Sequence, residues 1–231
     1  MDNLLAFAKG PLFALTFLFM LLGLSRHVLL QVRMLITKGR TLQRVKWRTV
    51  IGDTLSWAFP FDHLVRGTLL LTAVSIIFHI GAIIVPLFLA DHILLWEGFL
   101  GINLPSISQG LADVLTLSTI ASLCILLFYR ILISRSREMS RPSDYGMLVL
   151  ILFTFLSGFL ASHPAYSPLQ WNVMLLLHVL SAETLFLMVP FSKLAHIVLF
   201  PFDRLSQVHW QLKPGAGDKI AATLYGDKAR V

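Results

Sequence analysis

The sequence predicts an all-α integral membrane protein with five transmembrane helices, its N-terminus outside and its C-terminus in the cytoplasm. Of its 231 residues 56% are hydrophobic and only 13% are charged, and the mean hydropathy is positive. A membrane-spanning helix needs about 20 mostly apolar residues. Five stretches are close to that length or longer, which leaves no room for a large soluble domain; they are residues 11–30, 64–90, 111–133, 145–162 and 171–200.

The first stretch, residues 11–30, is expected to remain in the protein as a helix. No small-residue cleavage site follows it, whereas a basic loop does. Residues 1–212 are then one five-helix membrane domain. Residues 213–231 contain Gly, Pro and scattered charges, and we expect them to form a cytoplasmic tail.

The lysines and arginines determine the predicted orientation, because cytoplasmic loops carry the positive excess. Eight of the 19 lie between Arg26 and Arg66, four between Arg130 and Arg141, and six from Lys193 onward, so that only Lys9 falls on the other side. This topology, together with anionic lipid headgroups, accounts for the net charge of +7 without a nucleic-acid partner.

Two connections have contrasting compositions. Residues 33–63 mix basic and apolar side chains, a pattern typical of a short interfacial helix or of a docking site for a soluble partner. Residues 91–110 contain acids, Trp96 and turn residues but no Lys or Arg, and are expected to be an outer loop. The single cysteine, Cys124, excludes a disulfide, an iron–sulfur cluster and a Cys-rich zinc site within the chain.

Two histidines in the last stretch give the strongest functional signal. His178 and His196 are 18 residues apart, so a continuous helix would place them on one face, about 27 Å apart, one near each membrane surface. Two haems stacked across a bilayer, each held by a histidine pair, need this arrangement from one helix and a matching pair from another. The alternative is two histidines that form hydrogen bonds between packed helices.

The run LLHVLSAETLFLMVPFSKLAHIVLFP, at 176–201, resembles the last helix of the cytochrome b (gamma) subunit of respiratory nitrate reductases. It is still more similar to the related cytochrome b subunits of transmembrane electron-transfer complexes in sulfate- and metal-reducing bacteria. The resemblance extends over about residues 59–203, with FHIG at 78–81 and PSDY at 142–145 as further pieces. It implies that His178 and His196 are haem ligands, that haem b is bound at two sites or at least at one, and that the membrane is a bacterial or archaeal cytoplasmic membrane.

The second helix offers the partner ligands. Because it runs outward and the fifth helix inward, His79 should lie opposite His196 on the cytoplasmic side, and His92 opposite His178 on the outer side. His79 and His92 are 13 residues apart, which does not return to the same face, and the nitrate reductase pattern has a shorter spacing. A kink at Pro86 is expected to re-aim His92.

Other histidines are alternatives. His163 is the substitute ligand for the outer site, and His63 for the inner one. His27 and His209 are interpreted as structural.

Two acidic residues lie in or beside predicted helices. Glu183, five residues after His178 and turned from it by about 140°, is costly in a membrane and therefore usually functional or paired. It is a candidate proton acceptor for a quinol, or else a neutral group in a helix-packing hydrogen bond. Asp144 is expected to be the N-cap of the fourth helix.

The resemblance therefore implies a haem b subunit of a respiratory complex. It would exchange electrons between menaquinone or another quinone at the outer side and an iron–sulfur subunit, with or without a catalytic subunit, at the cytoplasmic face. The chain is then a quinol-oxidising or quinone-reducing subunit that is not catalytic alone. The reverse direction, from a periplasmic cytochrome c, stays open, and so do a proton-conducting or transporter subunit and a haem-free membrane anchor.

Overall fold

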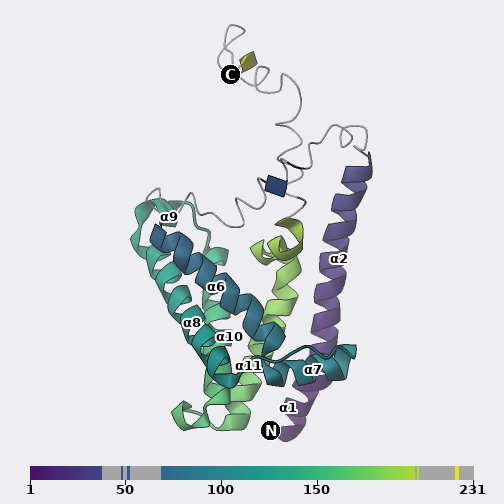
Figure 1. Ribbon diagram of the computed structural model, residues 1–231, viewed down its shortest axis with the longest axis vertical. Helices are drawn as coiled ribbons and strands as arrows, with labels where there is room; N and C mark the ends of the chain where they lie inside the picture. Colours follow the sequence, from purple (N-terminus) through teal and green to yellow (C-terminus); the bar gives the residue numbers. More distant parts are fainter. Residues whose placement is uncertain (38–47, 49–50, 53–68, 201, 203–221, 224–231) are drawn as a thin grey trace. The chain divides into compact units, whose positions relative to one another are not determined.

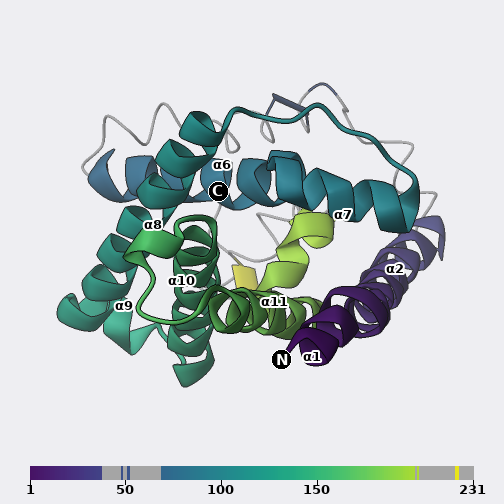
Figure 2. The same ribbon diagram turned by 90° about the horizontal axis from the view of Figure 1, so that it is seen from below.

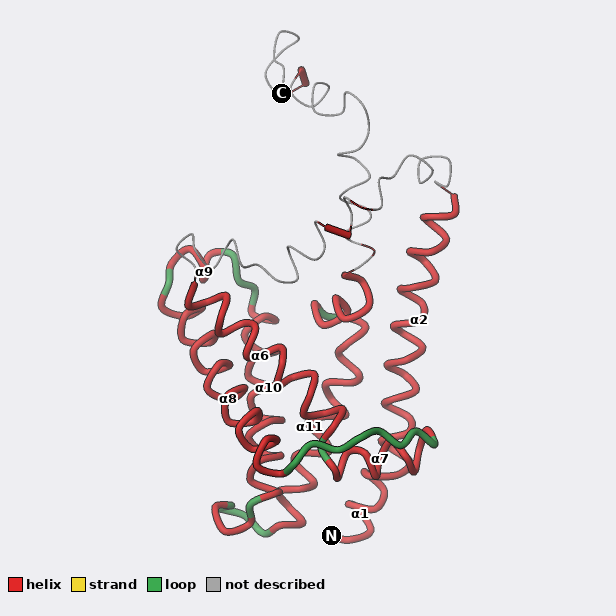
Figure 3. The backbone as a smooth tube through the Cα atoms, viewed as in Figure 1, coloured by secondary structure: helices red, strands yellow, loops and turns green. Residues whose placement is uncertain are grey.

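The computed structural model describes residues 1–37, 48, 51–52, 69–200, 202 and 222–223, and among these no strand occurs (Figures 1 and 3). Most of the predicted interfacial loop and tail lies outside the described residues, as do His63 and His209. The chain divides into two compact units, which are described separately. Unit 1 comprises Met1–Leu18 and Asp62–Leu187, and unit 2 comprises Phe19–Phe61 and Met188–Val231.

The described elements are helices joined by short connections. The α-helices are α1 (Asp2–Phe7), α2 (Phe13–Thr37), α6 (Leu69–Phe88), α7 (Ala90–Leu100), α8 (Gln109–Leu132), α9 (Ser134–Glu138), α10 (Pro142–Ser162) and α11 (Trp171–Met188). A π-helical turn at Ala8–Leu12 joins α1 to α2, and 3₁₀ turns lie at Pro164–Tyr166, Val189–Phe191 and Lys193–Ala195.

Five described helical segments are long and apolar enough to cross a membrane, the number that the sequence predicts. They are Asp2–Met34, Leu69–Phe88, Gln109–Leu132, Pro142–Ser162 and Trp171–Phe191. Large apolar side chains point outward on these helices; Leu22, Leu70 and Leu132, for example, are 62%, 69% and 71% exposed. Such surfaces are unfavourable in water and suit the hydrocarbon of a bilayer.

Several predicted boundaries are wrong. The first helical span begins at Asp2 rather than at residue 11, because Pro11 is accommodated in the π-helical turn. Residues 91–100, predicted as part of a loop, belong to α7, which starts at Ala90 after the extended Leu89 and is followed by Gly101 with φ 68°. The fourth helix starts at Pro142, so Asp144 is not its N-cap; Asp144 lies in the first turn and accepts a hydrogen bond from the backbone N–H of Arg141 at 3.0 Å.

The prediction of one continuous helix over residues 171–200 is also wrong. α11 ends at Met188, two 3₁₀ turns follow, and Ser192 between them is extended, with φ −118° and ψ 178°. Pro190 cannot donate a backbone hydrogen bond, and its ring is incompatible with an undisturbed helix. The same-face argument for His178 and His196, with its separation of about 27 Å, therefore fails.

In unit 1, α8 packs between α6 and α10 (Figure 2). The contact with α6 depends on Gly81, where a Cβ atom would collide with Thr119 Oγ1 and lie 3.0 Å from the carbonyl oxygen of Leu115. Thr119 and the neighbouring Leu123 are completely buried. The absence of a side chain at residue 81 thus sets how closely the two helices approach.

We expect Gly81→Ala to lower stability by about 1–3 kcal/mol, because an inserted methyl group must push the helices apart. Thermal unfolding in detergent measures the effect. Gly110→Ala is the control, since a Cβ atom there meets nothing within 4 Å. Thr119→Ala combined with Gly81→Ala should recover part of the loss, and an equal loss in the single and double variants would contradict this account of the contact.

Candidate functional site

His92 on α7 and His178 on α11 form a pair in unit 1. Their ring centres are 6.1 Å apart and their ring planes differ by only 3°. The sequence predicts these two residues as the ligands of an outer haem. The structure brings them together.

Each of the two imidazoles is oriented by a backbone carbonyl. His178 Nδ1 lies 2.9 Å from the carbonyl oxygen of Thr154, and His92 Nδ1 lies 3.2 Å from that of Pro86. Because a carbonyl oxygen only accepts, each Nδ1 carries the hydrogen, and the lone pair of the neutral ring is on Nε2. Metal-binding histidines are typically held in this way.

The separation of the two ring centres can be compared with that of two imidazoles that bind one metal ion from opposite sides. With a metal–nitrogen bond of about 2.0 Å, as in zinc–histidine sites, and about 1.1 Å from nitrogen to ring centre, two imidazoles on opposite sides of one ion have centres about 6 Å apart. The centres of the two stacked rings are 6.1 Å apart, which is close to this value.

The donor set of this pair consists of two imidazoles. The described residues contain no group of three or more His, Cys, Asp or Glu side chains that could hold a metal. A haem supplies four nitrogens to its iron and needs only two axial protein ligands. A pair of histidines is therefore a complete set for haem and an incomplete one for zinc.

A helix break positions His92. The helix α6 continues through Pro86 to Phe88, and the turn comes at Leu89, which has φ −66° and ψ 134°. The predicted re-aiming of His92 therefore happens at Leu89, three residues beyond the proline. Because the helix breaks here, side chains donate to the carbonyl of Pro86. This oxygen accepts hydrogen bonds from His92 Nδ1 and from Trp96 Nε1, the latter at 3.1 Å.

His92 lies on α7, which is not one of the five membrane-crossing helices. Burial lowers the pKa of its imidazole, while the hydrogen bond to the carbonyl of Pro86 opposes this shift. The lower pKa keeps the ring neutral at neutral pH, which is the form that binds metals.

His178 packs directly on the backbone of α10 at Gly158. A Cβ atom there would lie 2.8 Å from His178 Cε1 and 2.9 Å from Nδ1. Only glycine leaves this space, and the approach brings the ring within reach of the Thr154 carbonyl. The sequence pattern does not predict the roles of Gly158 and Thr154, although an isolated glycine in a helical pattern is a known sign of close approach between helices.

The structure does not favour His163 as an alternative ligand. Its Nδ1 lies 3.0 Å from the carbonyl oxygen of Phe159, and its Nε2 lies 3.3 Å from Asp113 Oδ2. Both ring nitrogens are engaged by acceptors. This histidine ties the end of α10 to the start of α8.

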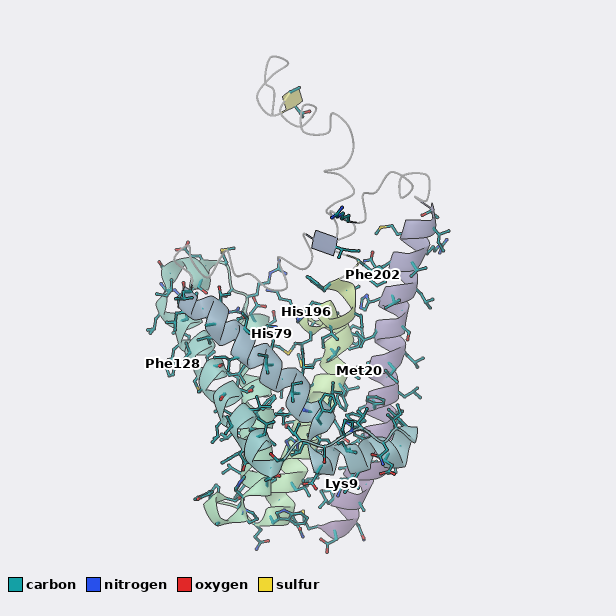
Figure 4. The ribbon with its side chains drawn as sticks, in the orientation of Figure 1. Lys9, Met20, His79, Phe128, His196 and Phe202 are labelled. Carbon is teal, nitrogen blue, oxygen red and sulfur yellow. The ribbon has the colours of Figure 1, made fainter. Side chains whose placement is uncertain are left out.

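The predicted inner ligands lie in different units, His79 on α6 in unit 1 and His196 directly after the last 3₁₀ turn in unit 2; both are labelled in Figure 4. Each Nδ1 lies 2.7 Å from a backbone carbonyl oxygen, that of Ser75 for His79 and that of Lys193 for His196. This orientation repeats the pattern of His92 and His178. The pairing of His79 with His196 stays a prediction.

Glu183 is buried on another face of α11. Its side chain is 3% exposed, and neither carboxyl oxygen has a hydrogen-bond partner in the described part of the chain. The helix positions before and after it on this face contact the first span: Leu176 and Val179 belong to a cluster with Leu5 and Ala8, and the ring of Phe186 is 5.8 Å from that of Phe13. Helical spacing thus places Glu183 in the contact between α11 and the start of α2.

Aromatic side chains border this contact. Ring centres 5.4 to 5.9 Å apart connect Phe13 and Phe17 to three further rings, those of Trp96, Phe99 and Phe186. A carboxyl group without a partner beside such a cluster is costly unless it holds a proton or receives a hydrogen bond.

A comparison with known proteins identifies a relative of this chain. The chain is 32% identical over 209 residues to a protein of Nitratidesulfovibrio vulgaris, and the match covers 86% of this chain and 89% of the relative. No family model and no solved structure matches the chain.

For a haem held by this histidine pair, we expect Gly158→Ala to displace the His178 ring and to weaken haem retention by about 10- to 100-fold, the usual effect of disturbing the surroundings of a metal ligand. The rate of haem transfer to apomyoglobin measures retention. Gly146→Ala on the same helix is the control, because a Cβ atom there meets nothing within 4 Å. Equal rates for the two variants would show that Gly158 does not position a ligand.

Proposed function

We propose that this chain, which belongs to the same family as the Nitratidesulfovibrio vulgaris protein, is a haem b-containing membrane subunit that exchanges electrons between a quinone pool and a soluble iron–sulfur partner. The observation that carries the proposal is the pair of parallel imidazoles of His92 and His178, 6.1 Å apart. The five apolar helices support the location in a membrane.

His92 and His178 would hold one haem through Nε2. A bis-histidine haem has no open position for oxygen or substrate, and it supplies one-electron redox chemistry. The chain fixes the two ligands in advance, since Thr154 and Pro86 orient the rings and Gly158 admits one of them. Such preorganisation suits a carrier that must change little between its two redox states.

His79 and His196 are the proposed ligands of a second haem. The resemblance to cytochrome b subunits supports this, because His196 matches a ligand position there. The common Nδ1-to-carbonyl orientation of the two residues also supports it. Two haems would carry electrons across the membrane, whereas one would serve a single side.

Glu183 is the proposed proton acceptor for a hydroquinone. Oxidation of a hydroquinone releases two protons as well as two electrons, and a buried carboxylate without a partner can take one proton from a hydroxyl group. Glu183 is five residues from His178 on the same helix, about 7.5 Å along its axis. Proton and electron acceptors would thus be close together but on different faces of α11.

We infer an iron–sulfur partner subunit from the cysteine content of the sequence. One cysteine cannot hold an iron–sulfur cluster, so the electrons must pass to or from another subunit. The distribution of Lys and Arg supports an outside N-terminus and a cytoplasmic face where an iron–sulfur subunit, with or without a catalytic subunit, would dock. A periplasmic cytochrome c would be the donor if electrons flowed in the reverse direction.

A proton-conducting subunit is the second candidate, and the unpartnered carboxyl of Glu183 favours it. The optical spectrum of the purified protein separates the two proposals. A b-type alpha band after reduction with dithionite supports the haem protein. Its absence, together with proton flux into liposomes that contain the purified chain, supports the second candidate.

We expect His92→Ala to halve the haem content and to reduce the redox titration to a single step, because one of two ligand pairs is lost. His163→Ala should retain both haems, since the ring nitrogens of His163 are engaged by Phe159 and Asp113. Haem is quantified per protein in each variant. Two retained haems in His92→Ala would disprove the assignment of this ligand.

We expect Glu183→Gln to slow haem reduction by a quinol about 100-fold while haem content is unchanged, because glutamine keeps the shape but cannot accept the proton. Stopped-flow absorbance measures the rate. Thr184→Ala, at an exposed neighbouring position, is the control. A loss of haem with unchanged quinol kinetics would instead show that Glu183 serves in helix packing.

A further inference from the structure

A histidine on the first span contacts the break in the last one. In unit 2, His27 Nε2 on α2 lies 2.7 Å from the carbonyl oxygen of Pro190. Because the carbonyl only accepts, Nε2 carries the hydrogen and donates it. His27 thus differs from the histidines of the candidate site, whose Nδ1 atoms contact carbonyls.

The carbonyl of Pro190 does not accept the hydrogen bond that it would accept in a continuous helix. In a continuous helix it would accept the N–H of residue 194. Here the N–H of Leu194 is directed to Ser192 Oγ at 3.2 Å. Pro190 is buried, and an unsatisfied buried carbonyl in a membrane is strongly unfavourable. His27 donates a hydrogen bond to this carbonyl.

Two more residues on the same face of α2 hold this segment. A Cβ atom at Gly23 would lie 2.5 Å from Pro190 Cβ, so only glycine allows the proline ring to approach. The rings of Phe19 and Phe191 are 5.8 Å apart. Residues 19, 23 and 27 repeat every four positions and therefore form one stripe along the helix.

The stripe fixes the segment that leads to His196. Ser192 caps the next 3₁₀ turn, Ala195 in that turn is buried, and His196 Nδ1 lies 2.7 Å from the carbonyl oxygen of Lys193. The orientation of His196 is thus set by a short turn whose start is anchored at Pro190.

We propose that His27 is a positioning residue for His196, acting through the Pro190 carbonyl. This inference rests on the proposed function, in which His196 holds a haem. His27 itself is not a ligand in this arrangement, because its Nε2 hydrogen is donated to the backbone.

The test compares four variants of the full chain in detergent. His27→Ala removes the donor, Gly23→Ala displaces Pro190 while leaving His27 in place, and His27→Gln keeps an N–H donor. Leu22→Ala is the control, because this neighbouring side chain on α2 is 62% exposed. The readouts are amide hydrogen exchange over residues 192–196, which does not depend on haem, and haem transfer to apomyoglobin.

We expect faster exchange in His27→Ala and Gly23→Ala, and about tenfold faster release of one of the two haems, as after loss of a group that orients a metal ligand. His27→Gln should lie close to the wild type in both measurements, and Leu22→Ala should equal it. If His27→Ala does not accumulate, Gly23→Ala and His27→Gln give the same comparison.

Unchanged exchange in His27→Ala and Gly23→Ala would overturn the inference, and so would faster exchange without faster haem release. A wild-type protein purified without haem would instead refute the proposed function and, with it, any role toward a haem ligand. The exchange data would still decide whether His27 anchors the turn.

Discussion

This structure depends on one constraint: every buried backbone carbonyl needs a hydrogen-bond donor. In hydrocarbon no water replaces a missing hydrogen bond, so each interruption of a helix must be compensated by side chains. The break after Phe88 leaves the Pro86 carbonyl to His92 and Trp96, and the break at Pro190 leaves its carbonyl to His27. The same hydrogen bonds that satisfy the backbone also fix the histidine rings.

The number of spans could be predicted from the sequence, because length and hydropathy alone define a membrane-crossing helix. The pairing of His92 with His178 was also predicted, from depth in the membrane. The sequence does not predict where the helices break at Leu89 and Pro190, because a proline can affect a helix in several ways. Pro86 is followed by two more helical residues, whereas the regular α-helix ends before Pro190. Gly158 contacts His178 and His27 contacts Pro190. Both partners are far away in the sequence, so no local sequence pattern predicts these contacts.

The two faces of α11 separate the proposed chemistry. His178 points to α10 and to His92, while Glu183 lies against the first span, about 140° around the helix. A metal ligand and an acid beside each other would perturb one another electrostatically. Their separation lets each be set by its own neighbours, His178 by a carbonyl and a glycine, and Glu183 by apolar and aromatic side chains.

The helix α7 has a further consequence for His92 and His178, the proposed ligand pair. A loop residue at position 92 would move with its loop, and binding a metal would have to order it. In the structure His92 lies within the helix α7, and its side chain donates to the Pro86 carbonyl oxygen. Trp96 donates to the same carbonyl oxygen. The segment that follows α7 is also fastened, because the N–H of Ile107 donates to the Phe88 carbonyl at 3.0 Å. Folding therefore already orders His92 before a metal binds. Less of the binding free energy is then lost in ordering the protein, and more of it holds the bound group.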